Sequence, residues 1–475
     1  MARFGRLGFL LVLLCLAVAG CAGRQYPYAP VISVSDRCER LFERWHLSVE
    51  TSGRIDVQDW SPPGFPYLRV DRFLASFDLA ALSPPQRRDW LTRSHTKAVT
   101  AWRYELQGGP PEADRLLADL RACAQQAITA LSSSAEFWPA LQQAATVPDS
   151  YSTAAQVFGL YPLVTPIVRW RASVTMGELA HRFGRYDVQS GWRRYGPVPG
   201  RSGARAAPEP YRRDSLGIPV LSEDEFRALV QRHAPSWRID TRDSNDVPGV
   251  PGRSGDGRLQ FRPEPVVFTQ LGFTFLDGAI LPQLTYVLWF PARPPEGVVD
   301  IYAGALDGVM WRVTMDQAGQ ALVYDTIHPC GCYHQWLLVD GGLRLRPDVD
   351  PEAEQLWVLG SVPGGSVAPV LSLSAGDHQL VAADFSGQLQ RRVKTQTYRL
   401  EALDRLRGAT HAGGRLYGAD GLIAGTERPE RFLLWPSGVV SAGAMRQWGH
   451  HAVSFVGRRH FDDPFVLDFF QSLTE

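Results

Sequence analysis

The spacing of apolar residues predicts helices over the first third of the chain. In residues 36–50 the apolar side chains recur every three or four positions, which places them on one face of a helix. They are Cys38, Leu41, Phe42, Trp45 and Val49. Residues 111–131 repeat the pattern, with prolines at the start and Cys123 on the apolar face. We therefore expect Cys38 and Cys123 to face a core.

Two further segments continue the helical pattern. We expect helices within residues 84–106 and 135–158. Residues 157–164 are almost entirely apolar, but Gly159 and Pro162 interrupt them. Proline removes a helical hydrogen bond, and the run is shorter than the roughly 20 residues that cross a bilayer. We therefore expect a buried turn between helices there.

The pattern changes to that of strands after about residue 260. Residues 285–290 and 309–314 are rich in β-branched and aromatic side chains. Residues 309–314 lead through a short polar turn into the apolar residues 321–327, which predicts a β-hairpin. Shorter strands are expected at residues 355–360, 379–383 and 432–435.

Two short helices are expected beside these strands. Ser222 is followed three residues later by Glu225, a capping-box pattern that predicts a helix as far as residue 233. Residues 464–473 suggest a second short helix near the end of the chain.

These patterns together predict an α+β chain of several domains. We expect a mainly helical domain over residues 33–190 and a β-rich domain over residues 221–475. The β-rich domain is expected to be a sandwich-like antiparallel arrangement with short flanking helices. Between the two, residues 191–220 are rich in Arg, Pro and Gly and are expected to form a linker or long surface loop.

Composition narrows the possible functions. Of the 475 residues 45% are hydrophobic, and 14 are tryptophans, so the chain is expected to bury a large aromatic core. Lys plus Arg and Asp plus Glu both number 49, so the formal net charge is zero. A chain without a net positive field has no global attraction for nucleic acid, and we expect no nucleic-acid partner.

The first 21 residues carry a targeting pattern. Arg3 and Arg6 precede an apolar run over residues 7–19, and the small residue Gly20 stands directly before Cys21. This order resembles the signal peptide and lipobox of bacterial lipoproteins. The resemblance implies removal of residues 1–20, attachment of lipid such as palmitate to Cys21, and a lipidated tether over residues 21–32. It covers only this segment of the chain.

The resemblance also implies a location. In Gram-negative lipoproteins an aspartate after the lipidated cysteine commonly signals retention in the inner membrane, and this chain has Ala22 there. The resemblance therefore implies an outer-membrane lipoprotein, which faces the periplasm and contacts the membrane through its N-terminal lipid.

An oxidising compartment changes how the remaining cysteines are interpreted. If Cys21 carries lipid, the disulfide candidates of the mature chain are Cys38, Cys123, Cys330 and Cys332. We expect a bridge between Cys38 and Cys123; two separate buried thiols are the alternative.

The densest chemical motif is His328-Pro329-Cys330-Gly331-Cys332-Tyr333-His334. Imidazoles and thiolates are ligands that zinc or copper prefers, and His451 and His460 could complete a site begun at His328, Cys330, Cys332 and His334. Alternate residues of a flat strand lie about 6.6 Å apart, too far for one tetrahedral ion, so the segment would have to bend. The alternatives are a static Cys330–Cys332 bridge that pins a loop and a redox pair of the same two cysteines.

Familiar catalytic motifs are absent from the sequence. It has no Gly-x-Ser-x-Gly elbow flanked by a strand and a helix, no Gly-x-x-x-x-Gly-Lys phosphate loop and no His-Glu-x-x-His pair. We therefore expect a non-catalytic binding or scaffolding role in the cell envelope, with a protein or glycan partner. The alternative is a metal- or thiol-dependent periplasmic enzyme centred on residues 328–334.

Overall fold

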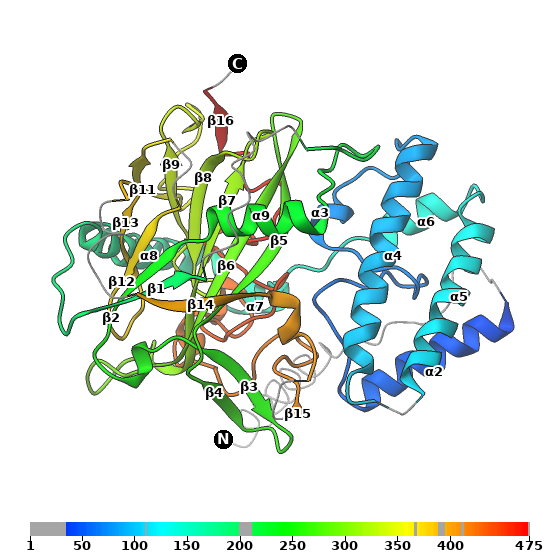
Figure 1. The fold of residues 1–475 in the computed structure, drawn as a ribbon, viewed down its shortest axis with the longest axis horizontal. Helices are drawn as coiled ribbons and strands as arrows, with labels where there is room; N and C mark the ends of the chain where they lie inside the picture. Colours follow the sequence, from blue (N-terminus) through cyan, green and yellow to red (C-terminus); the bar gives the residue numbers. More distant parts are fainter. Residues whose placement is uncertain are drawn as a thin grey trace, which may run out of the picture.

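The computed structural model describes residues 35–109, 112–198, 211–364, 368–387, 395–409 and 413–473. Several helices gather on one side of the molecule, and a large sheet occupies the other side (Figure 1). The expected signal peptide, Cys21 and the tether lie outside the described residues.

Seven helices precede the first strand in the described chain. Their bounds are α2 (Asp36–Thr51), α3 (Arg72–Ala75), α4 (Pro84–Leu106), α5 (Ala113–Leu131), α6 (Phe137–Ala144), α7 (Thr153–Phe158) and α8 (Tyr161–Arg182). The predictions for residues 36–50, 84–106 and 111–131 are confirmed by α2, α4 and α5. The segment 135–158 forms two helices, α6 and α7, instead of one. Ser35 caps the start of α2 by accepting a hydrogen bond from the backbone of Cys38.

A disulfide joins the two helices whose cysteines face the core. Cys38 of α2 and Cys123 of α5 are bonded, with their Cα atoms 5.4 Å apart. Both side chains are buried. The expected bridge between Cys38 and Cys123 is confirmed.

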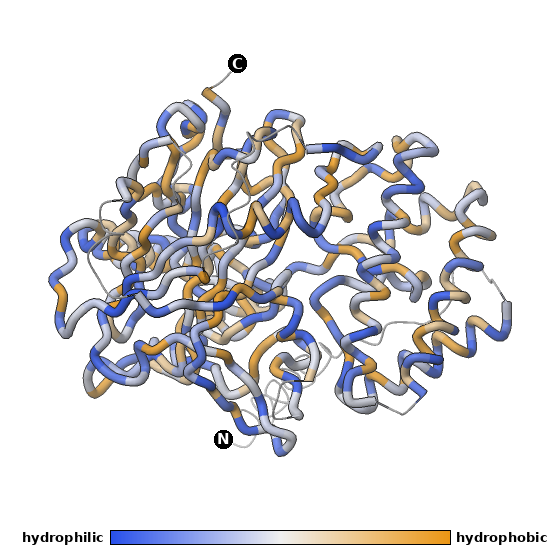
Figure 2. The backbone as a smooth tube through the Cα atoms, viewed as in Figure 1, coloured by the Kyte–Doolittle hydropathy of each residue, from blue (hydrophilic) through white to orange (hydrophobic). Residues whose placement is uncertain are grey.

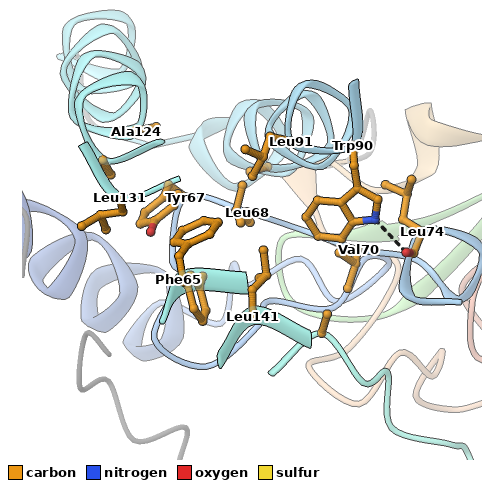
Figure 3. Close-up of a cluster of buried hydrophobic side chains, with 14 of the residues drawn as sticks. Phe65, Tyr67, Leu68, Val70, Leu74, Trp90, Leu91, Ala124, Leu131 and Leu141 are labelled. Atoms are coloured by element: carbon orange, nitrogen blue, oxygen red, sulfur yellow. Dashed lines mark hydrogen bonds between the residues drawn. The ribbon is translucent and has the colours of Figure 1, made fainter. Parts of the chain in front are cut away.

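The helices enclose an aromatic core around the loop that precedes α3. Figure 3 shows Phe65, Leu68 and Val70 of this loop in one apolar cluster with Trp90 and Leu91 of α4. The indole nitrogen of Trp90 donates a 2.9 Å hydrogen bond to the carbonyl of Leu74, so its polar atom is satisfied although the ring is fully buried. Hydrophobic and hydrophilic residues recur along each helix (Figure 2), as expected for helices with one buried face.

Residues 157–164 differ from their prediction. They do not form a buried turn: α7 ends at Phe158, α8 begins at Tyr161, and Leu163 is 72% exposed. Leu160 connects the helices with a left-handed backbone, and apolar residues of both helices are exposed. Apolarity alone could not predict whether another element covers this face.

The strands form one large mixed sheet in the described chain. Eleven strands lie in the order β11-β9-β8-β7-β6-β5-β14-β1-β2-β12-β13. Their bounds are β1 (Trp192–Pro197), β2 (Ser236–Asp240), β5 (Val266–Leu276), β6 (Ala279–Arg293), β7 (Gly304–Met315), β8 (Ala321–Ile327), β9 (Gln335–Val339), β11 (Trp357–Val362), β12 (Val370–Leu373), β13 (Leu380–Asp384) and β14 (Thr395–Ala402). Smaller sheets contain β3 (Val250–Ser254), β4 (Leu259–Arg262), β10 (Leu343–Leu345), β15 (Gly413–Gly414) and β16 (Phe470–Ser472).

An α+β composition is present, but the sandwich-like antiparallel arrangement is not. The strands β5 to β9 are antiparallel neighbours, whereas β14 pairs in parallel with both β5 and β1. Strand β1 lies within the segment expected as a linker, and residues 199–210 of that segment are outside the described residues. Strand pairs this distant in sequence leave no local signal, so pairing direction could not be predicted.

Other local predictions had mixed outcomes. The hairpin is confirmed by the pairing of β7 with β8, and the capping box at Ser222 starts α9 (Glu223–His233). Residues 432–435 form part of α10 (Arg431–Leu434) and η4 (Trp435–Ser437) instead of a strand. Residues 464–473 form turns and β16 instead of a helix.

The central strand β6 is buried on both faces. Tyr286 and Leu288 face one hydrophobic cluster, which α9 helps to cover (Figure 1), and Val287 and Trp289 face another. The second cluster is completed by the last 70 or so residues of the chain, which cover the opposite face of the sheet. The His328–His334 segment lies in this second layer.

Candidate functional site

The His-Pro-Cys-Gly-Cys-Tyr-His segment forms a tight turn between β8 and β9. The backbone nitrogen of His328 donates to the carbonyl of Cys332 at 3.0 Å, and that of Gly331 donates to the carbonyl of His328 at 2.8 Å. Gly331 has φ +93°, and a Cβ there would overlap the carbonyl oxygen of Ala452. Glycine is therefore required both by the backbone conformation and by the close approach of the C-terminal segment.

Each histidine at the ends of the turn is held by a buried aspartate. His328 Nδ1 lies 3.2 Å from Asp307 Oδ1, and His334 Nε2 lies 2.8 Å from Asp325 Oδ2. Both aspartates come from neighbouring strands of the sheet, β7 and β8. Burial lowers the pKa of His334 even though Asp325 opposes that change.

Asp307 belongs to a longer chain of buried charges. His378 Nδ1 lies 2.9 Å from Asp307 Oδ2, and its Nε2 lies 3.3 Å from Asp246 Oδ1. Burial disfavours the charged imidazole, but the two carboxylates outweigh it and raise the pKa of His378 to about 9. The ring also stacks on Phe290 at a centroid distance of 3.8 Å. At neutral pH the side chain of His378 is therefore an imidazolium that lies between the carboxylates of Asp246 and Asp307.

Arg428 adds a second cation to the same centre. Its Nη2 donates to the carbonyl of Leu306 at 3.0 Å and lies 3.3 Å from Asp307 Oδ1. Burial of Asp307 disfavours its ionisation, but His328 and Arg428 hold its pKa well below the usual range. Because all of these groups are buried, their mutual pairing fixes the turn to the sheet.

Cys330 and Cys332 are free thiols in this turn, so the expected static bridge between them is not formed. The interaction between the two thiols lowers the pKa of Cys330 and raises the pKa of Cys332 well above its usual range. Arg428 stabilises the thiolate of Cys330 further. The arrangement therefore favours loss of one proton, from Cys330.

Glu430 is a titratable group beside the thiols. It is 4% exposed, and its burial raises its pKa to about 7, although Arg428 and Arg293 act in the opposite direction. A carboxyl group with this pKa can accept and release a proton at neutral pH. The centre therefore combines two thiols with a possible proton acceptor.

The C-terminal histidines do not join the turn as a metal site. His460 Nε2 accepts a 2.9 Å hydrogen bond from the backbone of Ser150, and burial lowers its pKa well below the usual range. Burial likewise lowers the pKa of His451 to about 3. No three His, Cys, Asp or Glu side chains among the described residues are grouped to hold one ion. The six expected ligands, His328, Cys330, Cys332, His334, His451 and His460, are thus not brought together, since their imidazoles have separate partners.

A cavity of about 640 Å³ lies between α2 and the C-terminal segment. Most of its lining is apolar, including the aromatic residues Phe42, Trp45, Trp60 and Trp102. Ionisable residues are interspersed, among them His46, Glu50, Asp59, Arg69, Asp420, Arg446 and His450. This size and this mixture are typical of pockets for small ligands.

A network of buried ion pairs supports one wall of the cavity. Arg407 binds Asp56 and Asp59, and Lys97 Nζ lies 2.8 Å from Asp59 Oδ1. Burial opposes ionisation of Asp59, but Lys97 and Arg407 outweigh it and lower its pKa. Asp59 lines the cavity, and its ion pairs with Lys97 and Arg407 hold this part of the cavity wall in place.

Arg446 connects the cavity with the turn. It lines the cavity, and its Nε donates a 2.9 Å hydrogen bond to the carbonyl of Cys330. Its backbone nitrogen donates to the carbonyl of Pro329 at 3.0 Å. The cavity and the His-Pro-Cys-Gly-Cys-Tyr-His turn are therefore neighbouring parts of one region.

The sequence analysis missed most of the residues that surround the turn. These are Asp246, Asp307, His378, Arg428, Glu430 and Arg446. One available signal was a charged residue inside an otherwise apolar strand, as at Asp307 and Arg312 in β7. The other residues lie in loops or at a helix end, where charge is ordinary and gives no warning.

Comparison with protein-family models, curated proteins and solved structures returns no significant match. Among the described residues, none of the helices has both the length and the apolar character needed to cross a bilayer.

Proposed function

We propose that this protein is a lipid-anchored binding protein of the bacterial cell envelope. The lipobox pattern at Cys21 supports its attachment to the outer membrane, facing the periplasm, through an N-terminal lipid. The observation that carries the binding role is the aromatic cavity between α2 and the C-terminal segment.

The lining of the cavity favours a small molecule with an apolar body and a polar end. Tryptophan and proline side chains provide apolar contacts. Arg446 and His450 provide a few polar contacts at fixed positions, because both are already held by carbonyl groups, of Cys330 and Val57 respectively. A concave, partly open pocket of this size fits such a ligand better than it fits a protein surface.

The binding role can be tested with the fluorescent probe 8-anilinonaphthalene-1-sulfonate. Val147→Trp and Ile55→Trp place an indole at half-buried positions of the lining, and Leu47→Trp places one on an exposed position of α2 outside it. We expect saturable binding of the probe to the wild type and to Leu47→Trp, with about tenfold weaker binding to both cavity variants. Equal binding by all four proteins would overturn the proposal.

The lipid anchor needs a separate test. We expect radiolabelled palmitate to be incorporated into the wild-type chain in a Gram-negative host and to be absent from Cys21→Ser. Fractionation should find the wild type in the outer membrane. Incorporation that survives in Cys21→Ser would show that the lipid, if any, is attached elsewhere.

A second candidate function is thiol exchange at Cys330 and Cys332. The presence of two free thiols in one tight turn favours it, because an attacking thiol beside a resolving thiol is the arrangement that such exchange uses. Cys330 would attack a substrate disulfide and release one substrate thiol. Cys332 would then displace the second, so that the substrate gains two electrons and two protons and Cys330 and Cys332 become a disulfide.

Oxidised glutathione distinguishes the two candidates. If exchange occurs, the folded reduced protein loses both free thiols, and Cys332→Ser accumulates a mixed disulfide at Cys330. Thiols that react only after unfolding would exclude exchange and leave the turn with a structural role, since Cys330 and Cys332 are both buried.

A further inference from the structure

The described surface carries a large apolar face that the proposed binding role does not use. It is built from α7, α8, α10 and η4. Its members are large hydrophobic residues, all at least 44% exposed: Val157, Phe158, Leu160, Leu163, Ile167, Trp170, Phe432, Leu433 and Trp435. We call it the α8 face. A continuous apolar surface of this kind marks a binding surface in most soluble proteins.

The fold assembles this face from two segments that lie far apart in the sequence. The side chain of Gln156 donates a 2.9 Å hydrogen bond to the carbonyl of Ser437, and Ser152 donates its backbone nitrogen to Gly438. Gly159 packs so closely on Pro436 that a Cβ there would overlap the proline. The two apolar segments are therefore held together as one surface.

Within α8 the exposed residues keep a regular helical spacing. Leu163, Ile167 and Trp170 follow one another at intervals of three or four positions, so they lie along one side of the helix. The opposite side contributes Val168, Met176 and Leu179 to the interior. Helix α8 is thus apolar on two sides, of which one is exposed.

The charges next to the exposed residues of α8 are positive. Arg169 and Arg171 are exposed beside Trp170, and the guanidinium of Arg431 lies over the ring of Phe432 at 4.8 Å. The sequence from 153 to 177 contains no Asp or Glu. Arginines beside exposed tryptophan and leucine residues match a bilayer interface, where aromatic rings enter the headgroup layer and arginine binds lipid phosphates.

We propose that the α8 face binds the surface of a phospholipid bilayer that contains anionic lipids. Its exposed aromatic and aliphatic side chains would enter the headgroup layer, and Arg169 and Arg171 would bind phosphate groups. The proposal adds a second membrane contact to the proposed lipid anchor and depends on neither that anchor nor the cavity.

This contact would also orient the cavity. Pro148 and Ser150 line the cavity and lead directly into α7, and Val440 lines it just beyond η4. The α8 face and this part of the cavity wall are therefore continuous along the chain in two places. Docking of the α8 face would hold this part of the cavity wall close to the bilayer.

The test uses the mature chain from Ala22 onward, exported without lipid, and vesicles of phosphatidylethanolamine and phosphatidylglycerol. Two exposed residues of the face are replaced in Leu163→Glu/Trp170→Glu. The matched control, Leu47→Glu/Val298→Glu, changes two exposed residues elsewhere. We expect the wild type and the control to sediment with vesicles, with binding reduced about tenfold or more in the α8 variant. Because all these positions are exposed, the variants should remain folded, which circular dichroism can verify.

Three outcomes would overturn the proposal. They are absence of wild-type sedimentation, equal loss in the control, and a wild-type dimer in analytical ultracentrifugation that the α8 variant abolishes, since that dimer would make the face a contact between copies. Arg169→Gln/Arg171→Gln should weaken binding to these vesicles and leave the weaker binding to phosphatidylcholine vesicles unchanged. Since the chain tested carries no lipid, its result is independent of the outcome at Cys21.

Discussion

Arg312 and Asp325 face each other across neighbouring strands and form a fully buried, two-pronged ion pair. They are direct partners in the register of β7 with β8, with Nε to Oδ1 at 2.8 Å and Nη2 to Oδ2 at 2.6 Å. The guanidinium also lies over the ring of Phe461 at 3.8 Å, and His334 shares the carboxylate. The pair therefore links the sheet, the turn and the C-terminal segment.

Removing one partner of this pair is expected to destabilise the folded protein. Asp325→Ala leaves the guanidinium of Arg312 buried without its counter-charge, which should lower the free energy of unfolding by about 3–5 kcal/mol. The double variant Arg312→Met/Asp325→Leu removes both charges and should recover most of that loss. Urea unfolding of the three proteins measures the difference. A loss below about 1 kcal/mol in Asp325→Ala would contradict a structural role for the pair.

The fold could be predicted from the sequence where the signal is local. The helix at residues 36–50 has one apolar stripe, and the hairpin at 309–327 has two apolar segments around a polar turn, so local pattern sufficed. The parallel pairing of β1 with β14 joins residues about 200 apart, and no pattern within either strand specifies it. The exposed α8 face shows a second limit of prediction from sequence: a run of apolar residues does not reveal whether another part of the protein covers them.

The site could be predicted only in its central segment. Residues 328–334 are conspicuous because two imidazoles and two thiols lie close together in the sequence. Their observed partners come from elsewhere in the chain: Asp307 precedes His328 by 21 positions, and His378, which shares Asp307, follows that aspartate by 71. Thus the imidazoles and thiols could be recognised in the sequence. That the imidazoles pair with carboxylates could be learned only from the tertiary structure.

The close approach at Gly331 predicts intolerance to even a methyl group. Gly331→Ala combines a left-handed backbone with overlap of the new Cβ and the carbonyl of Ala452. We expect a loss of about 2–4 kcal/mol in the free energy of unfolding. Gly297→Ala is the matched control, because its φ is also positive at +109° but no atom lies within 4 Å of its Cβ position. Similar losses in both variants would mean that backbone strain alone, without the Ala452 contact, explains the effect.

The Cys38–Cys123 bridge should stabilise the helical region. It closes a loop with a sequence separation of 85 residues, and a loop of that length restricts the unfolded chain strongly. We expect Cys38→Ala/Cys123→Ala to lower the free energy of unfolding by about 2–5 kcal/mol. Dithiothreitol should reproduce this loss in the wild type and have no further effect on the double variant. An effect of the reductant on that variant would point to the other cysteines.

The charged state of His378 predicts a loss of stability at alkaline pH. Its pKa is about 9 in the folded protein, above the ordinary value of 6.5, because Asp246 and Asp307 flank the ring. A raised folded pKa contributes stability that is fully present below pH 6.5 and is lost as the pH rises through 9. With about 1.4 kcal/mol per pKa unit, the contribution is about 3 kcal/mol.

The variant His378→Gln isolates this effect, because buried tyrosines and other alkaline groups titrate equally in both proteins. We expect the wild type to be about 3 kcal/mol more stable than His378→Gln near pH 6, and we expect the two unfolding free energies to converge as the pH approaches 10. Denaturant unfolding at several pH values measures both curves. A difference that stays constant with pH would show that the pKa of His378 is not raised in the folded protein.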